Sequence, residues 1–269
     1  MSTIQYFDIN METLGRTRRV WVYLPSDYSE NGSPKPVIYM HDGQNLFFDH
    51  LTAYGTAWHV DKALDNLFAE RGMSAIVVGV ESSDSHRLSE YSPWKINFFA
   101  FKEKRTIAKK PNDGGEGEQY ARFFAEQLKD FVDGKFNTDN SRNATAVIGS
   151  SMGGLISCYL GLKYPQVYET MGLFSTYTEF NQFAFNRFLR NTPQKLQQHA
   201  FVYCGGKEGD DYTTNGRMTR NSVALYKALC KRGVKSELVL DSEQKHCEAA
   251  WDVHFKRFAL EFLQRYYER

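Results

Sequence analysis

Residues 145–163 read TAVIGSSMGGLISCYLGLK and carry the clearest local signal of the fold. The apolar run TAVIG gives way within two residues to a segment of helical length that starts at Met152. At the junction, the pattern G-x-S-x-G is formed by Gly149, Ser151 and Gly153. A G-x-S-x-G pattern that lies between a strand and a helix is typical of a nucleophile elbow. The glycines let backbone approach backbone in the tight turn and leave the Ser151 hydroxyl above the strand ends. The alternative is a glycine-rich turn that only packs the helix on the sheet.

The rest of the chain repeats this alternation of short apolar runs and helical segments. Such runs are typical of strands buried on both faces of a parallel sheet. Residues 4–10 and 17–24 instead alternate and should pair antiparallel at a sheet edge. We therefore predict a mostly parallel, doubly wound α/β sheet with helices on both faces, an N-terminal antiparallel edge, and ligands at the carboxyl ends of the strands. The predicted buried strands are 37–41, 75–80, 145–149, 169–175, 200–206 and 236–241, and the predicted helices are 58–69, 118–131, 152–163, 214–230 and 248–267.

A serine nucleophile needs a base that is itself oriented by a third group. In hydrolases of this layout the chain order is serine, acid, histidine, each on a loop that follows a strand. Among the histidines after Ser151, His199 opens a strand and so lies at the wrong end of the sheet, while His254 lies inside the last helix. His246 follows the last strand and is the predicted base. The alternative is a surface histidine without a catalytic role.

The acid is expected in the loop GGKEGDDY, which follows the apolar run AFVYC (200–204). Glu208 is the first of the three acidic residues in this loop and should lie nearest the sheet edge, within hydrogen-bond reach of the base, so it is the predicted acid. Asp210 and Asp211 compete with it. Asp241, at the end of the last strand, is a weaker candidate.

Two backbone N–H groups are candidates for an oxyanion hole. The first belongs to Met152, the residue after the nucleophile. The second belongs to Gln44 in the loop HDGQNLFFD, where Gly43 permits a turn close to the substrate. A plain β-turn is the alternative for this loop.

Two aromatic excursions leave the predicted sheet, at 91–118 and 176–199. Both could wall an apolar acyl or aromatic pocket, and the second lies where this fold commonly inserts a cap. We expect Trp94, Tyr177 and Phe180 to contact the substrate. The alternative is that these aromatic side chains pack the excursions onto the body of the protein.

Composition excludes several classes of function. There are 33 basic and 32 acidic residues, a net charge of +1, which removes the field on which nucleic-acid and anionic-membrane binders depend. The chain shows no apolar run long enough to span a membrane and no export signal, and its four cysteines form no C-x-x-C pair. We therefore expect one domain over residues 1–269, in the cytoplasm, with reduced thiols and no nucleic-acid or membrane partner.

His41, His50 and His59 recur at equal spacing and could suggest a metal site. The first ends a predicted strand, and no H-x-x-x-H pair with a carboxylate joins them. We predict neither a metal nor a cofactor.

Five blocks of this sequence resemble, in order, those of the esterase family of the α/β-hydrolase fold, which includes enterochelin (siderophore) esterases, feruloyl and acetyl xylan esterases and the antigen 85 mycolyltransferases. The resemblance covers about residues 17–267, and the HDGQNLF and H-x-E-A-A-W patterns are more specific than G-x-S-x-G. The five blocks are YMHDGQNLF (39–47), EYSPW (90–94), GSSMGG (149–154), GGKEGD (205–210) and KHCEAAW (245–251).

The resemblance implies the α/β-hydrolase fold and the same roles for the same residues: Ser151 as nucleophile, His246 as base, Glu208 as acid, and Gln44 with Met152 as oxyanion donors. The expected activity is cleavage of a small carboxylic ester, such as an acylated sugar, an aromatic acyl ester or a siderophore-like ester. An acyltransferase would use the same acyl-enzyme with another acceptor. A catalytically silent binding module on the same fold is the alternative outside enzymes.

Overall fold

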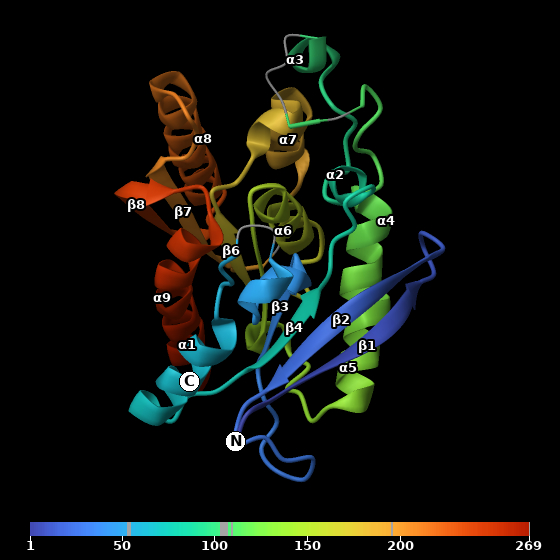
Figure 1. Cartoon of the computed structure of the whole chain (residues 1–269), viewed down its shortest axis with the longest axis vertical. Helices are drawn as coiled ribbons and strands as arrows, with labels where there is room; N and C mark the ends of the chain where they lie inside the picture. The colour runs from blue at the N-terminus through green and yellow to red at the C-terminus, as the bar shows by residue number, and fades with distance from the viewer. Residues whose placement is uncertain (53–54, 103–106, 109, 195, 269) are drawn as a thin grey trace.

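One mixed sheet of eight strands forms the centre of the described part of the protein (Figure 1). The computed structural model describes residues 1–52, 55–102, 107–108, 110–194 and 196–268. The strands are β1 (Thr3–Met11), β2 (Arg16–Leu24), β3 (Val37–His41), β4 (Ile76–Val80), β5 (Thr145–Ser150), β6 (Thr170–Phe174), β7 (His199–Lys207) and β8 (Lys235–Lys245).

The spatial order of the strands is β1-β2-β4-β3-β5-β6-β7-β8. All pairs from β4 to β8 are parallel, whereas β1 with β2 and β2 with β4 are antiparallel. This confirms the predicted mostly parallel sheet with an antiparallel N-terminal edge. Because parallel strands end together, the segments that follow β3, β5, β6, β7 and β8 meet at one edge of the sheet.

Side chains from the sheet alternate between two hydrophobic cores. Along β3, Val37 and Tyr39 belong to one core, whereas Ile38 and Met40 belong to the other, as the twofold period of a strand requires. Both faces of the central strands are therefore covered, which explains their continuous apolar sequence.

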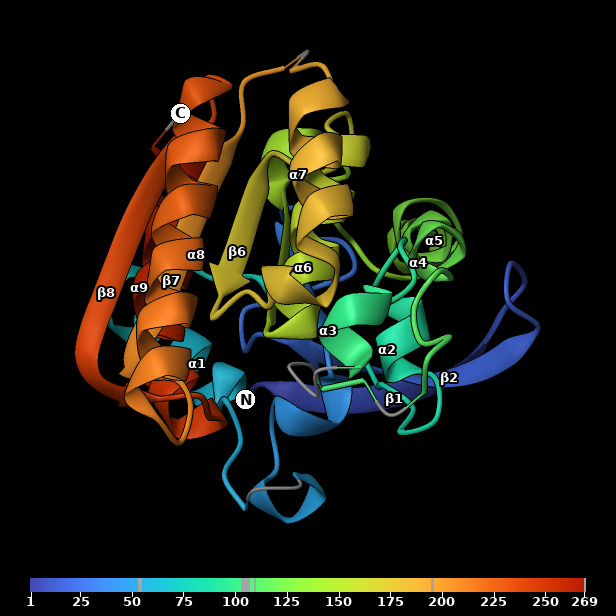
Figure 2. The same ribbon diagram turned by 90° about the horizontal axis from the view of Figure 1, so that it is seen from above.

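Helices cover both faces of this sheet. Helices α1 (Val60–Arg71) and α9 (Glu248–Tyr267) lie together over one face, and Figure 2 shows them on the side of the molecule away from α4 and α5. The other face is covered by four further segments. They are α4 (Gly117–Arg122), which continues through the π-helical turn η3 (Phe123–Leu128) into α5 (Lys129–Lys135), with α6 (Met152–Lys163), α7 (Gln182–Asn191) and α8 (Tyr212–Lys231).

The predicted helices are confirmed, with ends shifted by a few residues. The prediction for β8 was wrong in one respect, because the run 236–241 was expected to be buried on both faces. Every residue of β8 is half-exposed or exposed, because β7 is its one neighbour among the described strands and β8 forms the outer edge of the sheet.

The two aromatic excursions lie side by side. The backbone N–H of Asn97 donates to the carbonyl of Phe180 at 3.1 Å, and the Asn181 side chain donates to the carbonyl of Lys95 at 2.9 Å. Residues 103–106 and 109 of the first excursion and residue 195 of the second fall outside the described residues. The short elements of this region are α2 (Arg87–Glu90), α3 (Phe98–Lys102) and η5 (Thr178–Asn181).

Candidate active site

The strand-to-helix turn places Ser151 between β5 and α6. Its backbone has φ 56° and ψ −119°, a conformation that costs an ordinary residue energy and that clusters at functional sites. A Cβ built on Gly149 would lie 2.6 Å from the carbonyl carbon of Gly153, so only glycine fits at the first position of the motif. The N–H of Ser151 donates to the carbonyl of Phe174 at 2.9 Å and anchors the turn to β6.

Glu208 and His246 meet at the carboxyl edge of the sheet. His246 Nδ1 lies 2.5 Å from Glu208 Oε2. The Glu208 side chain has no exposed surface, whereas 29% of the His246 side chain is exposed. Because a carboxylate can only accept, Nδ1 carries the proton and Nε2 is left as the basic nitrogen.

The environment of Glu208 keeps it ionised. Burial acts to raise the pKa of its carboxyl, but the hydrogen bond and charge of His246, with hydrogen bonds from Ser175 and the Gly205 N–H, bring the pKa below its usual value. Glu208 Oε1 accepts from Ser175 Oγ at 2.6 Å and from the Gly205 N–H at 2.5 Å. Both oxygens of this buried anion therefore accept hydrogen bonds.

The three alternative acids are exposed or have other partners. Asp210 is exposed, and Asp211 caps the N-terminus of α8 by accepting the Thr214 N–H at 2.8 Å. Asp241 Oδ2 lies 3.1 Å from Nε2 of His254, a histidine inside α9 as predicted.

The loop after β3 is held close to β4. A Cβ on Gly43 would lie 2.5 Å from the carbonyl oxygen of Gly79, so this position requires glycine. Gln44, in the turn η1 (Gly43–Asn45), uses its side chain to donate to Ser82 Oγ at 2.9 Å and to accept the Ser82 N–H at 3.0 Å. These bonds fix the segment that carries the predicted oxyanion donor. Met152, the other predicted donor, is the first residue of α6 and is fully buried.

The three predicted substrate contacts differ in their surroundings. Tyr177 donates its backbone N–H to the carbonyl of Ser151 at 3.0 Å, so it adjoins the elbow. Trp94 is half-buried, with its ring 5.9 Å from that of Tyr159 and 5.6 Å from that of Phe188. Phe180 has no exposed surface. In this conformation Phe180 packs the excursions together and presents no face to a ligand, which is the packing alternative considered from the sequence.

The sequence did not single out Ser175, Trp251 or Arg87. Ser175 contacts Glu208, Trp251 donates its indole N–H to Ser175 Oγ at 3.1 Å, and Arg87 pairs with Asp42 beside Gly43. Trp251 closes the H-x-E-A-A-W block, so the motif held a signal for it. No local pattern marks Ser175.

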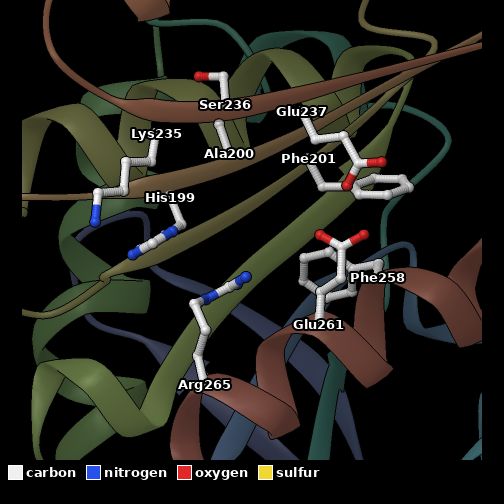
Figure 3. A pocket seen from close by; sticks show the side chains of 9 residues that line it. All are labelled: His199, Ala200, Phe201, Lys235, Ser236, Glu237, Phe258, Glu261 and Arg265. Carbon is white, nitrogen blue, oxygen red and sulfur yellow. The ribbon is translucent and has the colours of Figure 1, made fainter.

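A hollow of about 410 Å³ lies at the other end of the sheet (Figure 3). Its lining includes His199 and Lys235, the first residues of β7 and β8. Arg265 and Glu261 of α9 point into the same space in Figure 3. His199 therefore lies at the amino end of its strand, as predicted, and far along the strands from Glu208.

The evenly spaced histidines have separate surroundings. His41 is buried with Nδ1 3.1 Å from the hydroxyl of Tyr120, and His59 lies between Asp49 and Asp252 at 2.9 and 3.1 Å. Across the described ranges, no three His, Cys, Asp or Glu side chains are grouped closely enough to hold a metal ion. In those same ranges, no helix is both long and apolar enough to cross a bilayer.

Comparison with known proteins points to one family. The family described as "Putative esterase" matches residues 11–253. The uncharacterized protein YbbA of Bacillus subtilis (strain 168) is 24% identical over 249 residues, which cover 91% of this chain and 90% of YbbA.

Two solved structures share the fold. The siderophore hydrolase EstA from Aspergillus nidulans has a TM-score of 0.74 at 18% identity, over 97% of this chain and 94% of EstA. An IroE-like serine hydrolase from Shewanella oneidensis has a TM-score of 0.76 at 15% identity, over 97% of this chain and 80% of that one. The likeness extends across nearly the whole chain.

Proposed function

This chain belongs to the family described as "Putative esterase" and is an ester hydrolase, and we propose that it cleaves carboxylic esters through an acyl-enzyme formed on Ser151. In this proposal His246 is the general base and Glu208 orients it. The observation that carries the proposal is the 2.5 Å contact between His246 Nδ1 and the buried Glu208 carboxylate.

In the first half-reaction, Ser151 Oγ attacks the ester carbonyl carbon and its proton passes to Nε2 of His246. The Glu208 carboxylate stabilises the resulting imidazolium, and the N–H groups of Met152 and Gln44 stabilise the oxyanion. His246 then gives its proton to the leaving alcohol as the C–O bond breaks. In the second half-reaction His246 takes a proton from water as the water oxygen attacks the acyl carbon. The bond to Ser151 Oγ then breaks, His246 returns the proton to Oγ, and the carboxylic acid product leaves.

The proposed substrates are small esters with an aromatic or apolar acyl group, on a sugar or in a siderophore-like compound. Tyr177 adjoins the elbow and Trp94 is part of the neighbouring excursion, which supports them as walls of the acyl site. The siderophore hydrolase among the structural neighbours supports the same range. We also propose that the protein works in the cytoplasm, because all four cysteines are free thiols and two of them are buried.

Covalent labelling tests the proposal. A fluorophosphonate probe should modify Ser151, as identified by mass spectrometry of the labelled peptide, and Ser151→Ala should prevent labelling and reduce kcat by about 10³-fold or more. Ser150→Ala is the matched control, because Ser150 is the last residue of β5 and is buried. Active protein labelled at Ser150, or Ser151→Ala with wild-type turnover of p-nitrophenyl esters, would refute the assignment.

A further inference from the structure

A buried chain of hydrogen bonds extends from α9 through the end of β6 to the carboxyl of Glu208. Trp251 Nε1 donates to Ser175 Oγ at 3.1 Å, and Ser175 Oγ donates to Glu208 Oε1 at 2.6 Å. Ser175 has no exposed surface and Trp251 is 4% exposed. These bonds are therefore shielded from water. In the protein interior each hydrogen bond is stronger than at the surface.

The direction of this chain is determined by the indole. An indole N–H can only donate, so Ser175 Oγ must accept from Trp251 and its single proton must go to Glu208. The N–H of Gly205 supplies a second bond to the same oxygen, Oε1. Oε1 is thus occupied by two donors, and Oε2 alone faces His246.

The backbone supports the position of the serine. Ser175 has φ 44°, in the region that non-glycine residues seldom adopt. Its N–H donates to the carbonyl of Tyr203 at 2.7 Å, which holds the residue against β7. Strain of this kind persists where the surrounding structure requires the conformation. Here the backbone conformation places the Ser175 hydroxyl against Glu208.

Trp251 also touches the imidazole directly. Its ring lies 5.1 Å from that of His246 with an interplanar angle of 82°, an edge-to-face contact. One tryptophan therefore restrains both partners of the pair: the imidazole by contact, and the carboxylate through Ser175. His246, Glu208, Ser175 and Trp251 form a closed ring of contacts.

We propose that Ser175 and Trp251 are positioning residues that hold the Glu208 carboxylate in the orientation that keeps the proton on Nδ1 of His246. This inference rests on the proposed function, in which His246 is the base. Neither residue touches the reacting atoms in this role. Their contribution is to select the tautomer of His246 in which Nδ1 carries the proton and Nε2 is the basic nitrogen.

Kinetics and proton NMR test the role of Ser175 together. In Ser175→Ala we expect kcat to fall by about 10-fold with KM unchanged, the loss typical of removing an outer partner of an active group. The far-downfield Nδ1–H resonance of His246, assigned by its absence in His246→Ala, should move or disappear. A loss of kcat with the resonance unchanged, or no change in either, would overturn the proposal.

A double-mutant cycle tests the link to Trp251. Trp251→Phe removes the donor but keeps a ring, and should reduce kcat less than Ser175→Ala does. The double variant should be no worse than Ser175→Ala alone, because both changes act through one hydroxyl. Additive losses would overturn the chain of bonds. This cycle also keeps the proposal testable if Ser175→Ala folds poorly, because Trp251→Phe leaves the serine in place and should shift the His246 resonance by itself.

Trp58→Phe is the matched control for packing. Trp58 is buried in the same cluster, with its ring 5.5 Å from that of Trp251, but it is not the donor to Ser175. The Trp58→Phe variant should leave kcat and the His246 resonance unchanged. An equal effect of Trp58→Phe and Trp251→Phe would overturn the role of the Trp251 indole N–H. The resonance is read in the resting protein. A failure of the proposed function at Ser151 is therefore distinguishable from a failure of this inference.

Discussion

Arg87 donates two parallel hydrogen bonds to Asp42, from Nε to Oδ1 at 2.7 Å and from Nη2 to Oδ2 at 2.8 Å. Asp42 is 6% exposed and immediately precedes the turn that carries Gln44. Burial acts to raise the pKa of Asp42, but the charge and hydrogen bonds of Arg87 outweigh it, and the pKa lies below its usual value. Asp42 is therefore ionised, and its ion pair with Arg87 stabilises the loop after β3.

Asp42→Asn should destabilise the protein by about 3 kcal/mol, because it leaves a largely buried guanidinium without its counter-charge. Urea unfolding followed by tryptophan fluorescence measures this loss. Asp8→Asn is the matched control, since Asp8 pairs with Arg19 at 3.2 Å on the surface, where an ion pair contributes less than about 1 kcal/mol. Equal losses of unfolding free energy in the two variants would show that the buried Asp42–Arg87 pair stabilises the protein no more than a surface pair does.

Glu208→Gln should lower kcat by about 10²- to 10⁴-fold, because an amide can support the wrong tautomer of His246 and cannot stabilise its imidazolium. Asp210→Asn and Asp211→Asn are the controls. Both side chains are exposed, and asparagine caps a helix as well as aspartate does at position 211. Steady-state kinetics on one p-nitrophenyl ester compares the three. If either asparagine variant is the most damaged, Glu208 is not the acid, although the esterase activity would stand.

Gly149→Ala should prevent the native turn, because the new Cβ would meet the Gly153 backbone at 2.6 Å and neither chain segment can move cheaply. We expect a lower thermal midpoint and loss of fluorophosphonate labelling. Gly134→Ala is the opposite control: a Cβ at this position inside α5 would have no atom within 4 Å. That change should stabilise the protein by about 0.5–1 kcal/mol. A Gly149→Ala variant as stable and reactive as wild type would contradict the close approach.

His41 should make the protein less stable in mild acid. Burial lowers its pKa from 6.5 to about 3. Below pH of about 6.5, His41 is therefore protonated in the unfolded chain but stays neutral in the folded protein. The free energy of unfolding then falls by up to about 1.4 kcal/mol per pH unit.

The His41→Phe variant isolates this effect. It keeps a ring against Phe124, 4.6 Å away between centroids, but cannot titrate. Its free energy of unfolding should fall less than that of wild type between about pH 7 and about pH 5. His50→Gln, at an exposed position, is the matched control. Parallel curves for His41→Phe and wild type would mean that His41 does not contribute to the pH dependence.

Local patterns were enough to predict most of this fold. The runs at 37–41 and 145–149 are strands, and residues 152–163 form the helix that the sequence indicates. Such segments can be read from the chain because their apolar periodicity follows directly from burial on two faces. The turn at Ser151 is equally local, because Gly149 is required by the close approach of the Gly153 backbone, four residues further along the chain.

Sequence order also brought Glu208 and His246 into one hypothesis, because both follow strands that end at the same edge of the sheet. What it could not decide was the set of neighbours drawn from distant segments. Ser175 lies 33 residues from Glu208 and 76 from Trp251 along the chain, and their hydrogen bonds exist only once β6, β7 and α9 are packed together. The exposure of β8 and the complete burial of Phe180 likewise depend on which elements lie beside them. The local sequence pattern does not contain that information. Periodicity reports how a residue sits in its own element, whereas long-range packing decides which side chains it meets.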